Sequence, residues 1–256
     1  MPALVIALGY CWAIWRTVRA GWPGLSIHWP DRRSAILGGA VAAVLYFVFG
    51  PFLTPGILAS MYLHELGHVL ALRSVGQPAA FRAIPAFSAL PSWRMGQLSP
   101  GQAAFVSLMG AGLTLPVIVL AIAVAQMTAV SSPLVTNHFA AFAAVASLYS
   151  AFGLLPYLPL PGGRVFTDAG TAIWPLLPLV AGGALLAVTL TFAVGYQSLT
   201  LGFIAFVGIR GLMTANDIQA RPMDREIAIW TLAAYGALLV CLVNFGWPFI
   251  LYSLGA

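Results

Sequence analysis

The sequence predicts an all-α polytopic membrane protein. Of its 256 residues, 61% are hydrophobic and only 7% are charged, and the mean hydropathy is +0.96. Soluble domains have roughly 45–50% apolar and about 25% charged residues. A chain with so few charges has too little polar surface to cover its apolar residues in water, so most of its helices are expected to lie in a lipid bilayer.

Apolar runs divide the chain into about eight candidate transmembrane helices. These runs are 2–15, 34–53, 55–73, 102–127, 137–156, 171–194, 197–212 and 228–252. The first is the shortest for a crossing. Pro51 and Pro55 separate the second from the third and predict a tight hairpin there, and residues 195–198 separate the sixth from the seventh.

The connections between these runs are short. The longest, about 74–101, contains proline, glycine and aromatic residues without a clean helical period. It predicts a short β hairpin or a re-entrant segment at the membrane surface. No connection is long enough for a separate soluble domain, so we expect a single membrane domain over residues 1–256.

The basic residues predict the orientation of the chain. All eleven are arginines, against six acidic residues. With alternating crossings, every arginine lies on one side of the membrane, which the positive-inside rule identifies as the cytoplasmic side. Because the arginines are scattered between apolar runs, they favour a lipid bilayer over nucleic acid as the partner. The all-arginine usage further suggests a prokaryote, so we expect a multi-pass protein of its cytoplasmic membrane.

The stretch "YLHELGHVL" places three ionisable residues in an apolar run. His64 and His68 are four residues apart, so they share one face of a helix and can hold one zinc ion, while Glu65 can act on a zinc-bound water. An ionisable side chain at bilayer depth costs about 2.5–3.5 kcal/mol or more, which makes such a cluster a functional site by default. A hydrogen-bonded polar cluster that joins helices is the alternative interpretation.

Asp168 is the candidate for a third zinc ligand. The other acidic residues lie beside arginines in the connections, whereas Asp168 follows "LLPYLPLPGGRVFT" at the start of the sixth apolar run. That run begins on the same side of the membrane as the end of the third run, which places Asp168 at the depth of His64 and His68. An ordinary helix N-cap is the alternative role for this aspartate.

Together these stretches resemble the site-2 protease family of intramembrane zinc metalloproteases. "HELGH" in an apolar helix is followed about 100 residues later by the proline-rich "LLPYLPLPGGRVFTDAG". Between them, "ALRSVGQPAAFRAIPAF" resembles the family's membrane-associated β segment, and "FVSLMGAGLTLPVIVLAI" resembles its glycine-containing helix. The resemblance covers roughly residues 50–215, which we take as the catalytic core.

The resemblance implies a zinc-dependent metalloendopeptidase with its active site toward the cytoplasm. His64, His68 and Asp168 would bind one Zn²⁺, and Glu65 would be the catalytic base. The substrate would be a membrane-embedded protein, such as one with a single span. The second motif departs from the family's usual form, because Gly153 stands in place of an asparagine and Pro161 stands where an aspartate commonly precedes the two glycines.

Two other functions are compatible with the same residues. One is a membrane zinc hydrolase that acts on a lipid or a small amide. The other is a non-proteolytic homologue, in which the altered second motif leaves a protein that binds a metal or a partner. Zinc content and cleavage of model substrates would distinguish these alternatives from a protease.

The arginine distribution generates a test of the orientation. In a variant that lacks Cys11 and Cys241, single cysteines at Leu90 and Asp217 should react with a membrane-impermeant thiol reagent only from the cytoplasmic side. Single cysteines at Ser132 and Tyr196 should react only from the outside. Labelling of position 90 from the outside would reverse the orientation proposed for the whole chain.

Overall fold

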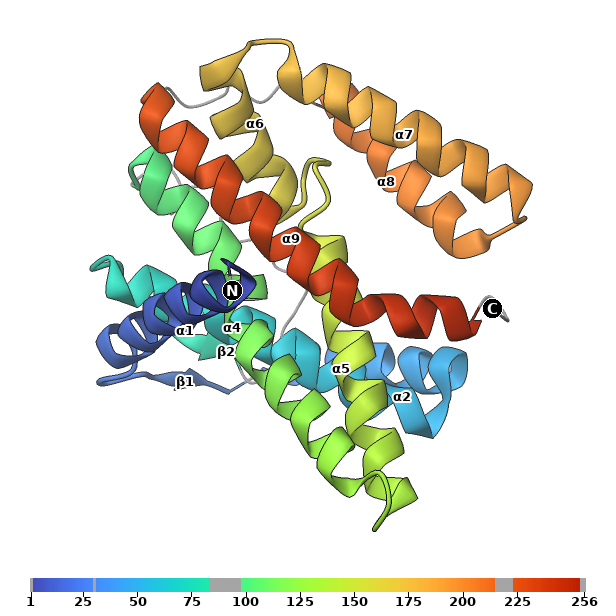
Figure 1. Ribbon diagram of the computed structural model, residues 1–256. Coiled ribbons are helices and arrows are strands. Elements are labelled where there is room, and N and C mark those ends of the chain that lie inside the picture. Colours follow the sequence, from blue (N-terminus) through green and yellow to red (C-terminus); the bar gives the residue numbers. More distant parts are fainter. Residues whose placement is uncertain (1, 30, 83–97, 215–222, 254–256) are drawn as a thin grey trace. The chain divides into compact units, whose positions relative to one another are not determined.

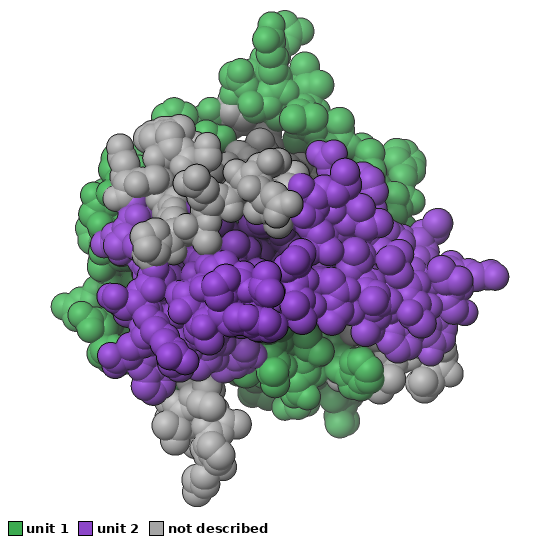
Figure 2. Space-filling model, turned by 90° about the horizontal axis from the view of Figure 1, so that it is seen from above, with its two compact units in different colours: residues 1–88, 109–152, 238–256 green, residues 89–108, 153–237 purple. Residues whose placement is uncertain are grey.

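The computed structural model describes residues 2–29, 31–82, 98–214 and 223–253 (Figure 1). The chain forms two compact units (Figure 2). The first comprises residues 1–88, 109–152 and 238–256, and the second comprises residues 89–108 and 153–237.

The first unit contains α1, α2, α5 and two short strands. Their bounds are α1 Pro2–Gly21, β1 Ile27–His28, α2 Arg32–Ser74, β2 Phe81–Arg82 and α5 Pro133–Gly153. Two further helices, α4 Pro100–Thr128 and α9 Arg225–Ser253, contribute residues to both units.

Helix α2 is a long helix with a break at Gly50. Asp31 caps its start by accepting a hydrogen bond from the backbone N–H of Ser34 at 2.8 Å, and this hydrogen bonding holds the pKa of Asp31 below its usual value. Gly50 adopts φ 75°, ψ 172°, a conformation that only glycine reaches without strain, and Pro51 and Pro55 follow it. A break in α2 therefore lies between the second and third apolar runs, and the tight hairpin expected there stays a prediction.

Arg73, in the last turn of α2, joins three segments of the first unit. Its guanidinium donates hydrogen bonds to the carbonyl oxygens of Gly21 at 2.6 Å, Pro23 at 2.5 Å and Ala79 at 3.2 Å. These oxygens belong to the end of α1, the turn after it and the segment before β2. Arg73 therefore fixes the end of α2 against both strand-bearing connections.

The two strands pair with each other in parallel. Ile27 lies opposite Phe81, and His28 lies opposite Arg82. The described part of the 74–101 connection thus forms a strand, as expected, but its partner comes from the connection after α1. The predicted hairpin concerns residues 83–97 as well, which lie outside the described residues.

The second unit contains α6 Pro161–Ile173, α7 Leu177–Gly195 and α8 Leu199–Thr214. Helices α7 and α8 lie side by side (Figure 1), and they approach closely where the Cβ of a side chain at Gly182 would lie 3.2 Å from Leu212 Cδ2. Their connection occupies the predicted position at 195–198, with Gln197 at φ 49°. The predicted run 171–194 is divided, because α6 ends at Ile173 and α7 begins at Leu177.

Membrane-length helices are confirmed, although fewer are evident than predicted. Five segments of the described chain are long and apolar enough to cross a bilayer: Arg32–Ser74, Pro100–Thr128, Pro133–Gly153, Leu177–Gly195 and Arg225–Trp247. The apolar part of α8, Leu199–Met213, is shorter. Large apolar side chains are nearly fully exposed on these elements, including Phe47 at 85% and Leu199 at 92%, as expected for surfaces that contact lipid.

Candidate metal centre

His64 and His68 lie one turn apart on the buried face of α2. Their exposed fractions are 9% and 5%, and their ring centroids are 4.7 Å apart with the ring planes at 83°. The spacing of four residues in a helix accounts for this proximity. The predicted pairing of the two imidazoles is therefore present in the first unit.

Both imidazoles direct Nε2 toward the same place beside Gly110 of α4. The position that a Cβ on Gly110 would occupy is 2.7 Å from Nε2 of His64 and 2.5 Å from Nε2 of His68. Both Nε2 atoms thus face the same part of the α4 backbone, as two histidine ligands of one metal ion would. The point itself is one C–C bond, about 1.5 Å, from Gly110 Cα, so a zinc ion bound to both nitrogens at about 2.0–2.1 Å would have to lie farther from α4.

The two imidazoles can lie against the α4 backbone because α2 and α4 meet at glycines. A Cβ on Gly67 would overlap the carbonyl oxygen of Met109 and the Cα of Gly110. The glycine of "HELGH" therefore lets the α4 backbone approach α2 at the level of the histidines. At Gly110 the missing side chain leaves room where it would otherwise contact both rings.

Glu65 is half-buried and shares Tyr149 with His64 as a neighbour. It interacts electrostatically with Arg82 of β2 and with Tyr149 of α5. The Tyr149 ring also lies edge-on to His64, with the centroids 5.6 Å apart. Glu65, Tyr149 and His64 thus form a polar cluster that includes one histidine of the pair.

Two buried polar atoms of the first unit have no hydrogen-bond partner among the described residues. They are Nδ1 of His64 and Oγ of Ser150, which follows Tyr149 on α5. Such an atom costs about 1–3 kcal/mol, and native proteins usually have a functional reason to retain one. The polar groups on α2 and α5 therefore have hydrogen-bonding capacity to offer a ligand.

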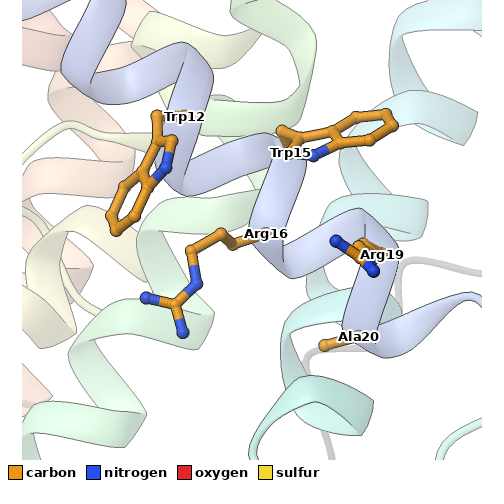
Figure 3. Close-up of a pocket in the computed structure, with 5 residues that line it drawn as sticks. All are labelled: Trp12, Trp15, Arg16, Arg19 and Ala20. Atoms are coloured by element: carbon orange, nitrogen blue, oxygen red, sulfur yellow. The ribbon is translucent and has the colours of Figure 1, made fainter.

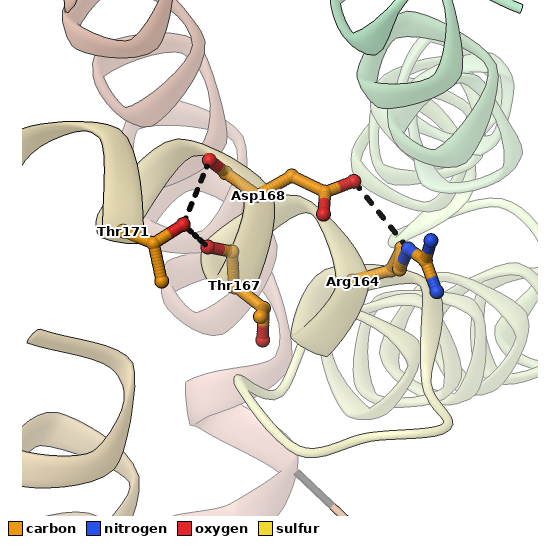
Figure 4. A network of polar contacts seen from close by, with 4 residues as sticks. All are labelled: Arg164, Thr167, Asp168 and Thr171. Carbon is orange, nitrogen blue, oxygen red and sulfur yellow. Dashed lines mark hydrogen bonds and ion pairs between the residues drawn. The ribbon is translucent and has the colours of Figure 1, made fainter. Parts of the chain in front are cut away.

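Asp168 lies in the second unit and is 2% exposed. Its Oδ2 is 3.4 Å from Nε of Arg164, one turn earlier on α6 (Figure 4). Thr171 donates to the backbone oxygens of Thr167 and Asp168 in the next turn. The alternative role of Asp168 as an N-cap is wrong, because α6 begins seven residues earlier at Pro161 and its N-cap position is Leu160.

Close backbone packing explains why the second motif contains Pro-Gly-Gly. Pro161 occupies the first turn of α6, where its missing N–H costs nothing. A Cβ on Gly162 would overlap the backbone of Leu154, and one on Gly163 would overlap the backbone of Tyr157. The two glycines therefore let the start of α6 pack on the preceding loop, and Asp168 follows two turns into the helix.

The predicted site residues are divided between the two units. His64, His68 and Glu65 lie on one helix of the first unit, whereas Asp168 belongs to the second. Within the described residues, no group of three or more His, Cys, Asp or Glu side chains is placed to hold a metal ion. Sequence reasoning missed Gly110 and Tyr149; "LMGAGL" indicated a glycine-rich helix, but nothing in it singled out one position.

Comparison of the chain with protein-family models, with curated proteins and with solved structures gave no match. The chemistry of the site is therefore argued from its own residues.

The approach of Gly110 generates a prediction about metal binding. Gly110→Ala should weaken Zn²⁺ binding about 10–100-fold, a loss typical of changes around metal ligands, because the new methyl group would displace both imidazoles. The measurement is zinc content and zinc affinity of the purified protein. Gly112→Ala is the matched control, since its Cβ would meet only Met109 Sδ at 3.4 Å. Equal zinc affinity in both variants would rule out a metal ion bound by both imidazoles beside Gly110.

Proposed function

We propose that the protein is an intramembrane zinc metalloprotease that hydrolyses peptide bonds in membrane-embedded protein substrates, and that it belongs with the site-2 protease family. The observation that supports this most directly is the pair of buried Nε2 atoms, from His64 and His68 of a membrane-length helix, that face the same part of the α4 backbone. Glu65 is adjacent in sequence and shares this depth. Asp168 is the proposed third ligand, which completes the three protein ligands usual for catalytic zinc.

In the proposed mechanism, the metal and the side chains have separate roles. A zinc ion held by His64, His68 and Asp168 would supply Lewis-acid chemistry, polarising the scissile carbonyl and lowering the pKa of a bound water. Glu65 accepts the proton of the attacking water and passes it to the leaving amine. His64 and His68 hold their rings in fixed orientations because Gly67 and Gly110 pack α2 against α4.

Tyr149 is the proposed donor to the carbonyl oxygen of the substrate. Its ring lies against His64, and its hydroxyl interacts electrostatically with Glu65. A hydroxyl in this position can donate a hydrogen bond to the negative charge that develops on the carbonyl oxygen during attack. In this role Tyr149 would supply a polar contact to the substrate, which Gly153, standing in place of the family's asparagine, has no side chain to make.

The substrate is proposed to enter as an extended segment beside β2. A transmembrane helix shields its own carbonyl groups by hydrogen bonding, so it must unwind before hydrolysis. Arg82 of β2 interacts with Glu65, which brings the two-stranded sheet near the proposed base. Among the described residues β2 pairs with β1 alone, and its other edge could bind an extended backbone by strand addition. The eight-crossing arrangement, with the site toward the cytoplasm of a prokaryote, belongs to the same proposal.

The first prediction of the mechanism concerns Glu65. Glu65→Gln should keep its zinc but lower turnover about 10²–10⁴-fold, the usual contribution of a general base. The measurement is cleavage of co-expressed candidate single-span proteins by wild type and variant, with zinc determined on the purified proteins. Cleavage at the wild-type rate would remove Glu65 as the base.

Tyr149→Phe provides the comparison in the same assay. Loss of one hydroxyl donor should lower kcat about 10²–10³-fold with zinc content unchanged. Wild-type protein that contains zinc and hydrolyses a lipid or a small amide, but no membrane protein, would favour the hydrolase alternative. Wild-type protein that neither holds zinc nor cleaves any substrate would favour the non-proteolytic alternative.

A second prediction separates the possible roles of Asp168. Asp168→Asn should lose zinc, because a neutral amide is a poor ligand and removes a compensating charge. Arg164→Gln should retain zinc but lower the thermal stability of the metal-free protein, since it leaves the buried carboxylate without this ion pair. If Asp168 serves only the ion pair, both variants will lose stability alike and both will keep the zinc content of wild type.

A further inference from the structure

Helix α1 has one buried stripe and one exposed face of tryptophan and arginine. Ile14 and Thr17 are 5% and 4% exposed, and Gly21 packs so closely on Leu70 of α2 that a Cβ would overlap its carbonyl oxygen. On the other side, Trp12 is 61% and Trp15 is 63% exposed. The helix is thus held by its buried stripe, and its tryptophans face outward.

The exposed face borders an open hollow of about 540 Å³. Its lining consists of Trp12, Trp15, Arg16, Arg19 and Ala20, all on α1 (Figure 3). The guanidinium of Arg16 lies 4.9 Å from the centre of the Trp12 ring, a cation–π contact that orders both side chains. The hollow therefore combines two aromatic rings with two cationic groups.

The two arginines have no carboxylate partner in the described part of the chain. Arg73 donates to three carbonyl oxygens, and Arg164 pairs with Asp168. Arg16 lies over the Trp12 ring, and Arg19 faces the same hollow. As far as the described residues go, both guanidinium groups can therefore bind an anion without giving up an ion pair.

We propose that this face of α1 binds the phosphate of an anionic phospholipid headgroup. The planar fork of an arginine matches two phosphate oxygens at once. Tryptophan is the side chain that prefers the headgroup level of a bilayer, because its ring is apolar and its N–H is polar. A free phosphate would use only the arginines, whereas a lipid also covers the exposed rings of Trp12 and Trp15, so the lipid is the better occupant.

This site is independent of the proposed proteolysis, and a binding experiment tests it. The full-length protein in neutral detergent is titrated with dansyl-labelled phosphatidylglycerol or phosphatidylcholine, and energy transfer from tryptophan reports binding. Wild type should prefer phosphatidylglycerol. Arg16→Gln/Arg19→Gln should weaken that binding about 30-fold, since each arginine near an anionic lipid contributes about 1 kcal/mol. Arg19→Gln alone should weaken it about fivefold, which covers the case in which the double variant misfolds.

The matched control is Arg32→Gln/Arg33→Gln, which removes the same charge from two exposed positions at the start of α2. It should change the affinity less than about threefold. Equal losses in the two double variants would overturn the site in favour of general charge attraction. An equal affinity of wild type for both lipids would also overturn it, as would competition by millimolar inorganic phosphate that displaces the labelled lipid completely.

Discussion

The close approach of α2 and α4 at Gly67 and Gly110 is the contact on which the candidate site depends. In lipid the hydrophobic effect between helices is weak, so association rests on close packing, and small residues permit it. Here the same pair of glycines has a second consequence. Gly67 brings the α4 backbone to the level of the histidines, and Gly110 lets both Nε2 atoms lie against that backbone. The packing of α2 on α4 and the geometry of the histidine pair therefore depend on the same two glycines.

Arg73 provides a second set of contacts that holds the first unit together. A guanidinium at the end of an apolar helix is expensive to bury unless its donors are satisfied, and here the carbonyl oxygens of Gly21, Pro23 and Ala79 accept them. The same bonds hold α1 and the β2 connection against the helix that carries His64 and His68. Arg82 of β2 interacts with Glu65. The position of the sheet beside the polar cluster therefore depends on Arg73 as well.

The sequence predicted features that depend on local spacing and missed those that depend on contacts between helices. The His64–His68 pair follows from helical periodicity, and the break at Gly50 follows from the two prolines beside it. The N-cap role of Asp168 was wrong because α6 begins at Pro161, ahead of the apolar run that begins at residue 171. Gly110 and Tyr149 could not be singled out, because their importance comes from α4 and α5 packing beside α2. The partner of β2 likewise comes from a connection about fifty residues earlier in the chain.

Arg164 bears on how Asp168 could serve as a metal ligand. A carboxylate that is 2% exposed in an apolar protein needs a nearby cation, and Arg164 supplies one from the preceding turn. At 3.4 Å the Nε–Oδ2 separation is longer than a strong charge-assisted hydrogen bond, which is about 2.7–2.9 Å. The pair therefore neutralises the carboxylate without holding it tightly. On the proposed function, a bound metal would take over the charge compensation, and Arg164, whose side chain is 27% exposed, could turn toward solvent at little cost. On this proposal the Asp168 carboxylate has two states, one paired with Arg164 and one bound to the metal. Arg164 lowers the free-energy cost of burying the carboxylate when no metal is bound.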